Sequence, residues 1–196
     1  MKNREIKLHA VAEAQQGYFT TKQAVAAGYV APTHHYHVGT GAWVRERRGI
    51  YRLAMFPASP EGQYVLWSLW SCTRDERPQG VFSHQTALGI HDLSDLMPAK
   101  LHMTVPESFR RSVAIPKVLC LHRAGLASGD VVQRQGFRVV LPLRAVVDLL
   151  KEGAESPDHL RQALKQGLAR GLIGRSEIRR HPDRKMIERL LKGGGR

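Results

Sequence analysis

Histidines are the residues whose type and spacing most readily suggest chemistry in the first part of this chain. The segment HHYH places His34 and His37 three residues apart, so that both can share one face of a helix and offer ligands to a metal ion. No neighbouring cysteine or carboxylate completes a ligand set. A helix with several histidines is more often simply a polar surface, and we expect no metal at this segment.

The second part of the chain contains further histidines, among them His84, His91, His102 and His122. His84 and His91 are seven residues apart and can lie on one face of a helix. A metal-dependent nuclease needs carboxylates grouped around a cation, and Asp92 and Asp95 do not form such a group with a lysine on consecutive strands. We expect these histidines to be core or hydrogen-bonding residues, with no metal and no cofactor.

Other catalytic patterns are absent from the sequence. Ser83 and His84 are adjacent, which does not indicate a catalytic pair, and the chain contains no GxSxG, no phosphate-binding glycine loop and no HExxH. Cys72 and Cys120 form no CxxC pair and no zinc-ligand spacing, so we expect two buried thiols in a reducing cytoplasm. The sequence therefore predicts a protein that is not an enzyme.

Arginines around a glycine give a stronger indication of function. The segment RERRGIYRL, Arg45 to Leu53, carries four arginines in nine residues, and Trp43–Val44 and Ile50–Leu53 are predicted as short strands. A hairpin with cations on its rim can lie along a phosphate backbone, and the formal charge of +13 favours a nucleic-acid partner. The alternative is a solvated strand edge whose charges prevent aggregation.

The elements before this hairpin indicate how it is used. The sequence predicts a helix over Asn3–Gln16, an extended GYFT, a helix over Lys22–Ala27 capped by Thr20 or Thr21, and a helix from Pro32 to about Val38. Followed by the hairpin, this is the order of a winged helix-turn-helix domain. The hairpin is then the wing, which contacts the DNA backbone.

The helix from Pro32 would enter the major groove. His34 and Val38 are four residues apart and should both face inward, which leaves Thr33, His35 and Tyr36 facing outward. The predicted DNA-binding residues are Thr21, Lys22, Thr33, His35, Tyr36, His37, Arg45, Arg47, Arg48 and Arg52. If His35 and His37 are exposed, DNA binding should strengthen as the pH falls toward 6.

A linker with two prolines and a glycine, residues 56–62, separates two predicted domains, 1–56 and 63–196. Helices and strands alternate in the second domain, which predicts an α+β fold with a small mixed sheet and C-terminal helices. The predicted helices lie over Gln63–Cys72, after Ser83 as the cap, over Pro142–Leu150, over Asp158–Arg170 and after Gly174. The predicted strands are Leu101–Val105, Val118–His122 and a hairpin-like pair, Val131–Gln135 and Phe137–Leu141, around Gly136.

Basic residues also gather later in the chain. Residues 175–196 include eight basic and three acidic side chains, and end in KGGGR. They form either a nucleic-acid-binding tail or a solvated, partly disordered end. Additional nucleic-acid contacts are predicted at Arg110, Arg111, Arg179 and Arg180. No apolar run approaches the roughly 18 residues of a membrane span, and the start, MKNREIKLHA, has no apolar signal core, so we expect a cytoplasmic protein.

Several segments resemble one known family. GYFTTKQAVAAGY and GAWVRERRGIYRL are similar to the N-terminal winged helix of AbiEi-like antitoxins, transcriptional regulators of type IV toxin–antitoxin systems linked to abortive phage infection. The later segments FSHQTALGIHDL, LHMTVP, LHRAGL and GFRVVLPLRAVVDLL resemble, in that order, the C-terminal part of that family. The resemblance covers roughly residues 5–175, and the order of the segments is more specific than any one of them.

The resemblance implies an autorepressor that binds inverted repeats upstream of its own operon, with two copies as the natural arrangement on such a site. It also implies a second domain that opposes a nucleotidyltransferase-like toxin without being an enzyme and without a stable complex. Where relatives place arginines or serines in the third helix, this chain has histidines and a tyrosine. Two alternatives remain: a protein- or RNA-interaction module whose winged helix binds no specific DNA, and a metal-dependent nuclease.

Overall fold

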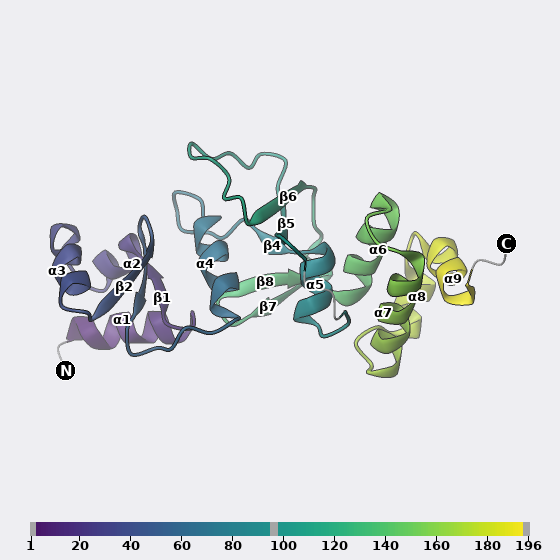
Figure 1. The fold of residues 1–196 in the computed structure, drawn as a ribbon, viewed down its shortest axis with the longest axis horizontal. Helices are drawn as coiled ribbons and strands as arrows, with labels where there is room; N and C mark the ends of the chain where they lie inside the picture. The colour runs from purple at the N-terminus through teal and green to yellow at the C-terminus, as the bar shows by residue number, and fades with distance from the viewer. Residues whose placement is uncertain (1–2, 95–97, 194–196) are drawn as a thin grey trace. The chain divides into compact units, whose positions relative to one another are not determined.

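The computed structural model describes residues 3–94 and 98–193, and its ribbon is drawn in Figure 1. Contacts divide the chain into two compact units, residues 1–80 with 133–138, and residues 81–132 with 139–196. The division falls after Gly80 rather than in the 56–62 linker, because helix α4 (Gly62–Trp70) packs against strands of the first unit. The domain bounds 1–56 and 63–196 stay a prediction.

The first unit begins with the predicted winged-helix order. Its elements are α1 (Asn3–Glu13), β1 (Tyr18–Thr20), α2 (Thr21–Ala26), a 3-10 turn η1 (Ala31–Thr33), α3 (His34–Gly39), β2 (Trp43–Arg47) and β3 (Ile50–Leu53). The strands form a small antiparallel sheet in the order β1-β3-β2. In Figure 1, α1, α2 and α3 surround this sheet. The third predicted helix is thus split, with Pro32 in the 3-10 turn that leads into α3.

A capping box at the start of α2 and an aromatic core stabilise this unit. The Thr20 side chain accepts a hydrogen bond from Gln23 N at 3.1 Å, and the Gln23 side chain accepts one from Thr20 N at 2.8 Å, which is a capping box at the start of α2. Phe19 from β1 is fully buried and meets Trp43 from β2 edge to face, with ring centroids 4.8 Å apart. The core therefore links the sheet to the helices that cover it.

A mixed five-stranded sheet forms the base of the second unit, apart from residues 133–138 around the β7–β8 turn, and a small mixed sheet is what the sequence predicts. Its strands are β4 (Val81–Phe82), β5 (Leu101–Val105), β6 (Leu119–Arg123), β7 (Val131–Arg134) and β8 (Phe137–Val140). They are ordered β6-β5-β4-β8-β7, with β5 parallel to β6, β4 antiparallel to β5, and β4 parallel to β8. A short 3-10 turn, η2 (Ser128–Asp130), precedes β7.

Helices complete the second unit. They are α5 (His84–Ile90), α6 (Pro142–Glu152), α7 (Pro157–Ala169), α8 (Arg175–Arg180) and α9 (Arg184–Lys192). Helix α6 packs against α5 and α7, and α9 packs against α7. Gly153 ends α6 in the left-handed conformation, with φ of 60°. None of the described helices is both long and apolar enough to cross a membrane.

The C-terminal segment differs from its prediction. The sequence predicts one short helix and a frayed tail, whereas residues 175–192 form two helices and the Ile187 and Leu190 side chains of α9 are buried. Most of the predicted basic tail is therefore ordered helix, because its apolar residues recur at helical spacing and pack on α7. The final residues of the predicted tail, 194–196, lie outside the described residues, as does Asp95.

Candidate nucleic-acid interface

The wing is the β2–β3 hairpin, closed by Arg48 and Gly49. Gly49 has a φ of +76°, and the strand register shifts between Arg45 and Arg47. Arg45 and Arg48 are exposed, and no side chain in the described part of the chain pairs with either of them. These two guanidinium groups are therefore available to a polyanion without breaking an existing interaction.

The other two wing arginines are engaged within the unit. The Arg47 guanidinium lies 4.6 Å from the centre of the Trp67 ring, although the residue remains exposed. Arg52 Nε is 2.8 Å from Glu46 Oε1, and the Arg52 side chain is only 11% exposed. Arg52 also donates to the Phe56 carbonyl oxygen. This geometry removes Arg52 from the predicted DNA-binding set, because its charge is neutralised and turned inward.

Helix α3 presents two different faces. The His34 side chain is buried and packs against Trp43 and Tyr51, with ring centroids 5.1 and 5.9 Å away, so the prediction that it faces inward is confirmed. His35 and Tyr36 face solvent, and Tyr36 is 63% exposed. Thr33, in the preceding turn, is also exposed, and its hydroxyl donates to the Val30 carbonyl oxygen at 2.7 Å.

His37 does not match its predicted role. Its ring is half-buried and stacks on Trp43, with centroids 4.7 Å apart, while its edge meets Tyr29. Burial, with a contribution from the nearby Arg4 charge, lowers the pKa of His37 below its ordinary value. A lowered pKa reduces the charge that His37 can gain near pH 6, so the prediction that DNA binding strengthens there rests mainly on His35.

Thr21 and Lys22 connect α2 to the rest of the unit. Thr21 N donates to the Gly49 carbonyl oxygen at 2.9 Å, and the Thr21 hydroxyl approaches the same oxygen at 3.4 Å. Lys22 is exposed and its ammonium donates to the Arg74 carbonyl oxygen. Thr21 thus holds the wing turn against the start of α2.

The remaining predicted contacts lie in the second unit. Arg110 and Arg111 are exposed in the loop after β5, where Arg110 donates to the Glu107 and Phe109 carbonyl oxygens at 2.8 and 2.9 Å. Arg179 and Arg180 are exposed on α8, where Arg180 Nε donates to the Ser176 carbonyl oxygen at 3.2 Å. Their contact with nucleic acid stays a prediction.

The structure also gathers polar residues that the sequence does not connect. His84, His102, Cys120, His122 and Glu152 come together in the second unit from four different elements. His91 is not among them, because its Nε2 lies 2.9 Å from the Val140 carbonyl oxygen instead. Cys120 is half-buried rather than buried as predicted, whereas Cys72 is buried. No local spacing signals this group, since its members lie on α5, β5, β6 and α6.

Comparison with known proteins bears on the N-terminal part of the chain. Residues 7–54 match the family model described as transcriptional regulator, AbiEi antitoxin. The winged-helix region is therefore an AbiEi-type regulator domain, as the sequence resemblance implied. This match spans less than half of the chain, and it ends at residue 54, one residue after the wing strand β3.

A solved structure supports the whole fold. The crystal structure of the RV2827C protein from Mycobacterium tuberculosis aligns with a TM-score of 0.58 at 14% sequence identity, covering 100% of this chain and 73% of that one. At this identity the similarity shows the fold alone, an α+β architecture. No curated protein matches the sequence.

Proposed function

We propose that this protein is a DNA-binding transcriptional autorepressor and the antitoxin of a type IV toxin–antitoxin system that acts in abortive infection, a phage defence. The observation that carries the DNA-binding part is a pair of exposed arginines, Arg45 and Arg48, on the wing of an AbiEi-type domain, which have no side-chain partner in the part of the chain that the structure describes. The exposed side of α3 stands on the same small unit, so both can face one duplex.

In the proposed binding mode, helix α3 and the wing contact different parts of the DNA. Helix α3 enters the major groove and offers Thr33, His35 and Tyr36 to base edges and phosphates. Arg45 and Arg48 bind the sugar–phosphate backbone beside it, and Arg47 adds a third charge that remains exposed above Trp67. Two copies, one on each half of an inverted repeat upstream of the operon, match the symmetry of such operators.

The antitoxin part rests on the regulator family alone. The second unit would counteract a nucleotidyltransferase-like toxin in the cytoplasm without catalysing a reaction. If the two activities belong to different parts of the chain, changes in the wing should spare toxin neutralisation. Growth rescue of cells that express a nucleotidyltransferase-like toxin tests this point. A wing variant that remains folded but fails to protect, where the unchanged protein protects, would argue against separate activities.

Autorepression is tested with a reporter gene behind the upstream DNA of this operon. The variant Arg45→Ala/Arg48→Ala should release the reporter, because it removes both free wing cations without touching a buried contact. The matched control, Lys117→Ala/Lys165→Ala, loses the same two charges from exposed positions of the second unit and should still repress. Equal repression by the two variants would instead favour the interaction module whose winged helix binds no specific DNA.

A further inference from the structure

Two neighbouring parallel strands bring three potential metal ligands to one place in the second unit. In the β5–β6 register, His102 lies opposite Cys120, and Thr104 lies opposite His122. Cys120 and His122 are two residues apart on β6, so their side chains project from the same face of the sheet. All three ligand residues are half-buried, which leaves the site within reach of an ion from solvent.

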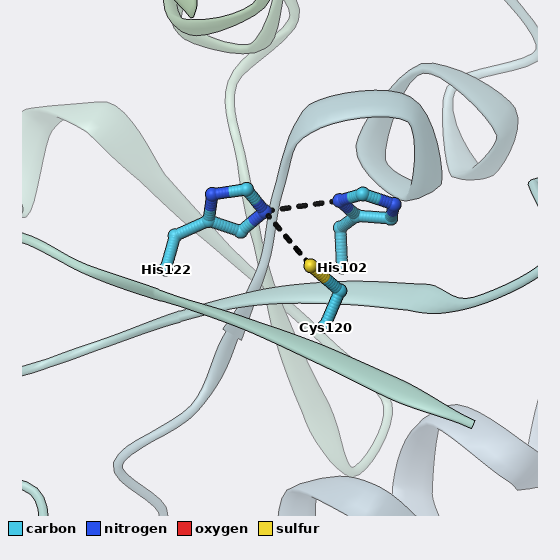
Figure 2. A group of neighbouring side chains, drawn as sticks. All are labelled: His102, Cys120 and His122. Carbon is cyan, nitrogen blue, oxygen red and sulfur yellow. Dashed lines mark hydrogen bonds between the residues drawn. The ribbon is translucent and has the colours of Figure 1, made fainter. Parts of the chain in front are cut away.

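The ligand atoms of these residues converge. His102 Nδ1 lies 2.9 Å from His122 Nε2, and Cys120 Sγ lies 3.8 Å from the same nitrogen. Figure 2 shows the two ring nitrogens facing each other, with the sulfur to one side. A tetrahedral Zn²⁺ with ordinary bond lengths separates two nitrogens by about 3.3 Å, and a nitrogen from a sulfur by about 3.6 Å. The two measured separations differ from these values by a few tenths of an ångström, and all three ligand atoms lie within 4.8 Å of one another.

A carboxylate orients the central histidine. Glu152 Oε1 lies 3.3 Å from His122 Nδ1, at the C-terminal end of α6. The Nδ1–H group of His122 donates to this oxygen, which leaves a lone pair on Nε2 directed at His102 and Cys120. A carboxylate behind a histidine in this way is the usual arrangement around protein-bound zinc, because it fixes the ring tautomer and makes the ligand nitrogen more basic.

A second chain of hydrogen bonds holds the carboxylate. Thr104 Oγ1 donates to Ser83 Oγ at 2.9 Å, Ser83 Oγ lies 2.9 Å from His84 Nδ1, and His84 Nε2 lies 3.1 Å from Glu152 Oε1. The Ser83 hydroxyl therefore donates to His84, and the opposite ring N–H donates to Glu152. This use of Ser83 explains why it does not cap α5 through its side chain, as its position before the helix predicted.

The backbone of His84 is also unusual. Its φ is +54°, in the left-handed region that residues with a side chain rarely adopt. Such residues cluster at functional sites, where surrounding contacts hold them in place. Here the contacts to Ser83 and Glu152 hold the His84 ring against His122.

Two histidines of this group have pKa values below the ordinary value. Burial, together with the neighbouring His122 and His84, lowers the pKa of His102 to about 4. Burial and His122 also lower the pKa of His84, although Glu152 opposes this.

A second possible ligand set, His84, His122 and Glu152, is less suitable. The His84 and His122 rings are stacked, with centroids 3.6 Å apart and planes 13° from parallel. Lone pairs on such rings run side by side and do not converge on one ion, whereas two parallel N–H groups can both donate to one carboxylate oxygen. Glu152 therefore serves as the acceptor behind the histidines, and the metal belongs on the other side of His122.

We propose that His102, Cys120 and His122 bind a Zn²⁺ ion, with Glu152 orienting His122 and a fourth coordination position left for water or another ligand. One thiolate and two imidazoles are the ligands that zinc prefers, and three protein ligands leave that position open. This site goes beyond the proposed function and revises the expectation, drawn from the sequence, that the chain holds no metal. The ion would join β5 to β6 and, through Glu152, to α6.

The test uses the full chain, stripped of metal by a chelator. Zn²⁺ affinity is measured by calorimetry, and Co²⁺ is added as a coloured substitute whose thiolate bond gives a charge-transfer absorption band. We expect one ion per chain, a cobalt–thiolate band, and a Tm that rises by several degrees with Zn²⁺. Cys120→Ser should remove the band and weaken Zn²⁺ binding by about 100-fold or more, and Glu152→Gln should weaken it by about 10- to 100-fold.

Two controls separate this site from other ligands in the chain. Cys72→Ala removes the other cysteine and should keep the cobalt band, and His35→Ala/His37→Ala removes histidines of α3 and should leave Zn²⁺ affinity unchanged. A cobalt spectrum of the wild-type chain without a thiolate band would overturn the proposal, even if Cys120→Ser failed to fold. So would Zn²⁺ affinity that is lost in the α3 variant but kept in Cys120→Ser.

Discussion

The wing of the first unit and the histidine cluster of the second unit are suited to binding different partners by different physical interactions. Arg45 and Arg48 are fully charged, exposed and unpartnered among the described residues, so they attract a polyanion over several ångströms and respond to salt. His102 and His122 are half-buried, and a hydrogen bond joins their rings. They can therefore bind only an atom or ion in direct contact with them. A surface for a long polymer needs the first arrangement, and a pocket for one ion needs the second.

The same contrast occurs within the wing itself. Arg48 at the turn is exposed, whereas Arg52 on β3 is paired with Glu46 and donates to a backbone carbonyl. Two arginines four residues apart therefore have different tasks: one is available to a partner, and the other holds the hairpin together. Charge counted along a sequence does not separate these tasks.

The largest expected effect is a loss of stability that is confined to the first unit. Phe19→Ala removes a fully buried ring from the winged-helix core and should lower its free energy of unfolding by about 3–5 kcal/mol. DNA binding should then be lost, while the cobalt spectrum of the second unit is kept. Chemical denaturation followed by tryptophan fluorescence, beside anisotropy and cobalt absorption, measures all three. Loss of the cobalt band together with DNA binding would show that the two units do not behave separately.

The two wing arginines offer a sharper comparison. Arg52→Ala should lower the free energy of unfolding by about 1–3 kcal/mol, because it leaves the partly buried Glu46 carboxylate without its partner. Arg48→Ala should leave stability nearly unchanged but reduce the slope of log affinity against log salt by about 0.9, the loss of one phosphate contact. Thermal melts and salt-dependent anisotropy on both variants check this, and the reverse pattern would contradict the assignment.

His34 gives a smaller effect that depends on pH. Its buried Nε2 has no hydrogen-bond partner among the described residues, and burial lowers its pKa. The unfolded chain therefore binds more protons at His34 than the folded chain does. The free energy of unfolding is then highest above the pKa that His34 has in the unfolded chain, and it decreases as the pH falls through that value. His34→Phe should raise stability by about 1 kcal/mol near neutral pH and flatten its decrease between pH 7.5 and 5. An unchanged pH profile in denaturation experiments would contradict this.

The smallest expected effect concerns His37. Because its pKa lies below the ordinary value, lowering the pH from 7.5 to 6 should add little charge to α3 through this residue. The ratio of DNA affinities at the two pH values should therefore be the same for His37→Gln as for the wild type. If DNA affinity changes with pH in the wild type but not in His37→Gln, His37 is a pH-dependent contact after all.

The winged helix was predictable because its signals are local. Thr20 caps α2 through residues three apart, Pro32 begins the turn before α3, and Gly49 supplies the positive φ of the wing. The inward direction of His34 follows from its spacing to Val38, which packs against the core. Each of these features depends on a few neighbouring residues, so the sequence alone specifies them.

The features that the sequence did not predict depend on register and on distant partners. The pair of Arg52 with Glu46 requires the alignment of β2 with β3, including its irregularity between Arg45 and Arg47. The meeting of His102 with Cys120 requires β5 and β6 to pair in parallel in one register, although a loop separates them. Glu152 joins them only because α6 ends beside His122. Nothing in the spacing of these residues encodes those alignments.

The most direct test of the central claim is fluorescence anisotropy of the full chain with a labelled duplex from the DNA upstream of its gene, beside a scrambled duplex of equal length. Both are measured at two salt concentrations. A specific regulator should bind the native duplex about a thousandfold or more tightly than the scrambled one. Equal affinities that fall steeply with salt would mean that the +13 charge merely attracts polyanions, and would contradict the autorepressor.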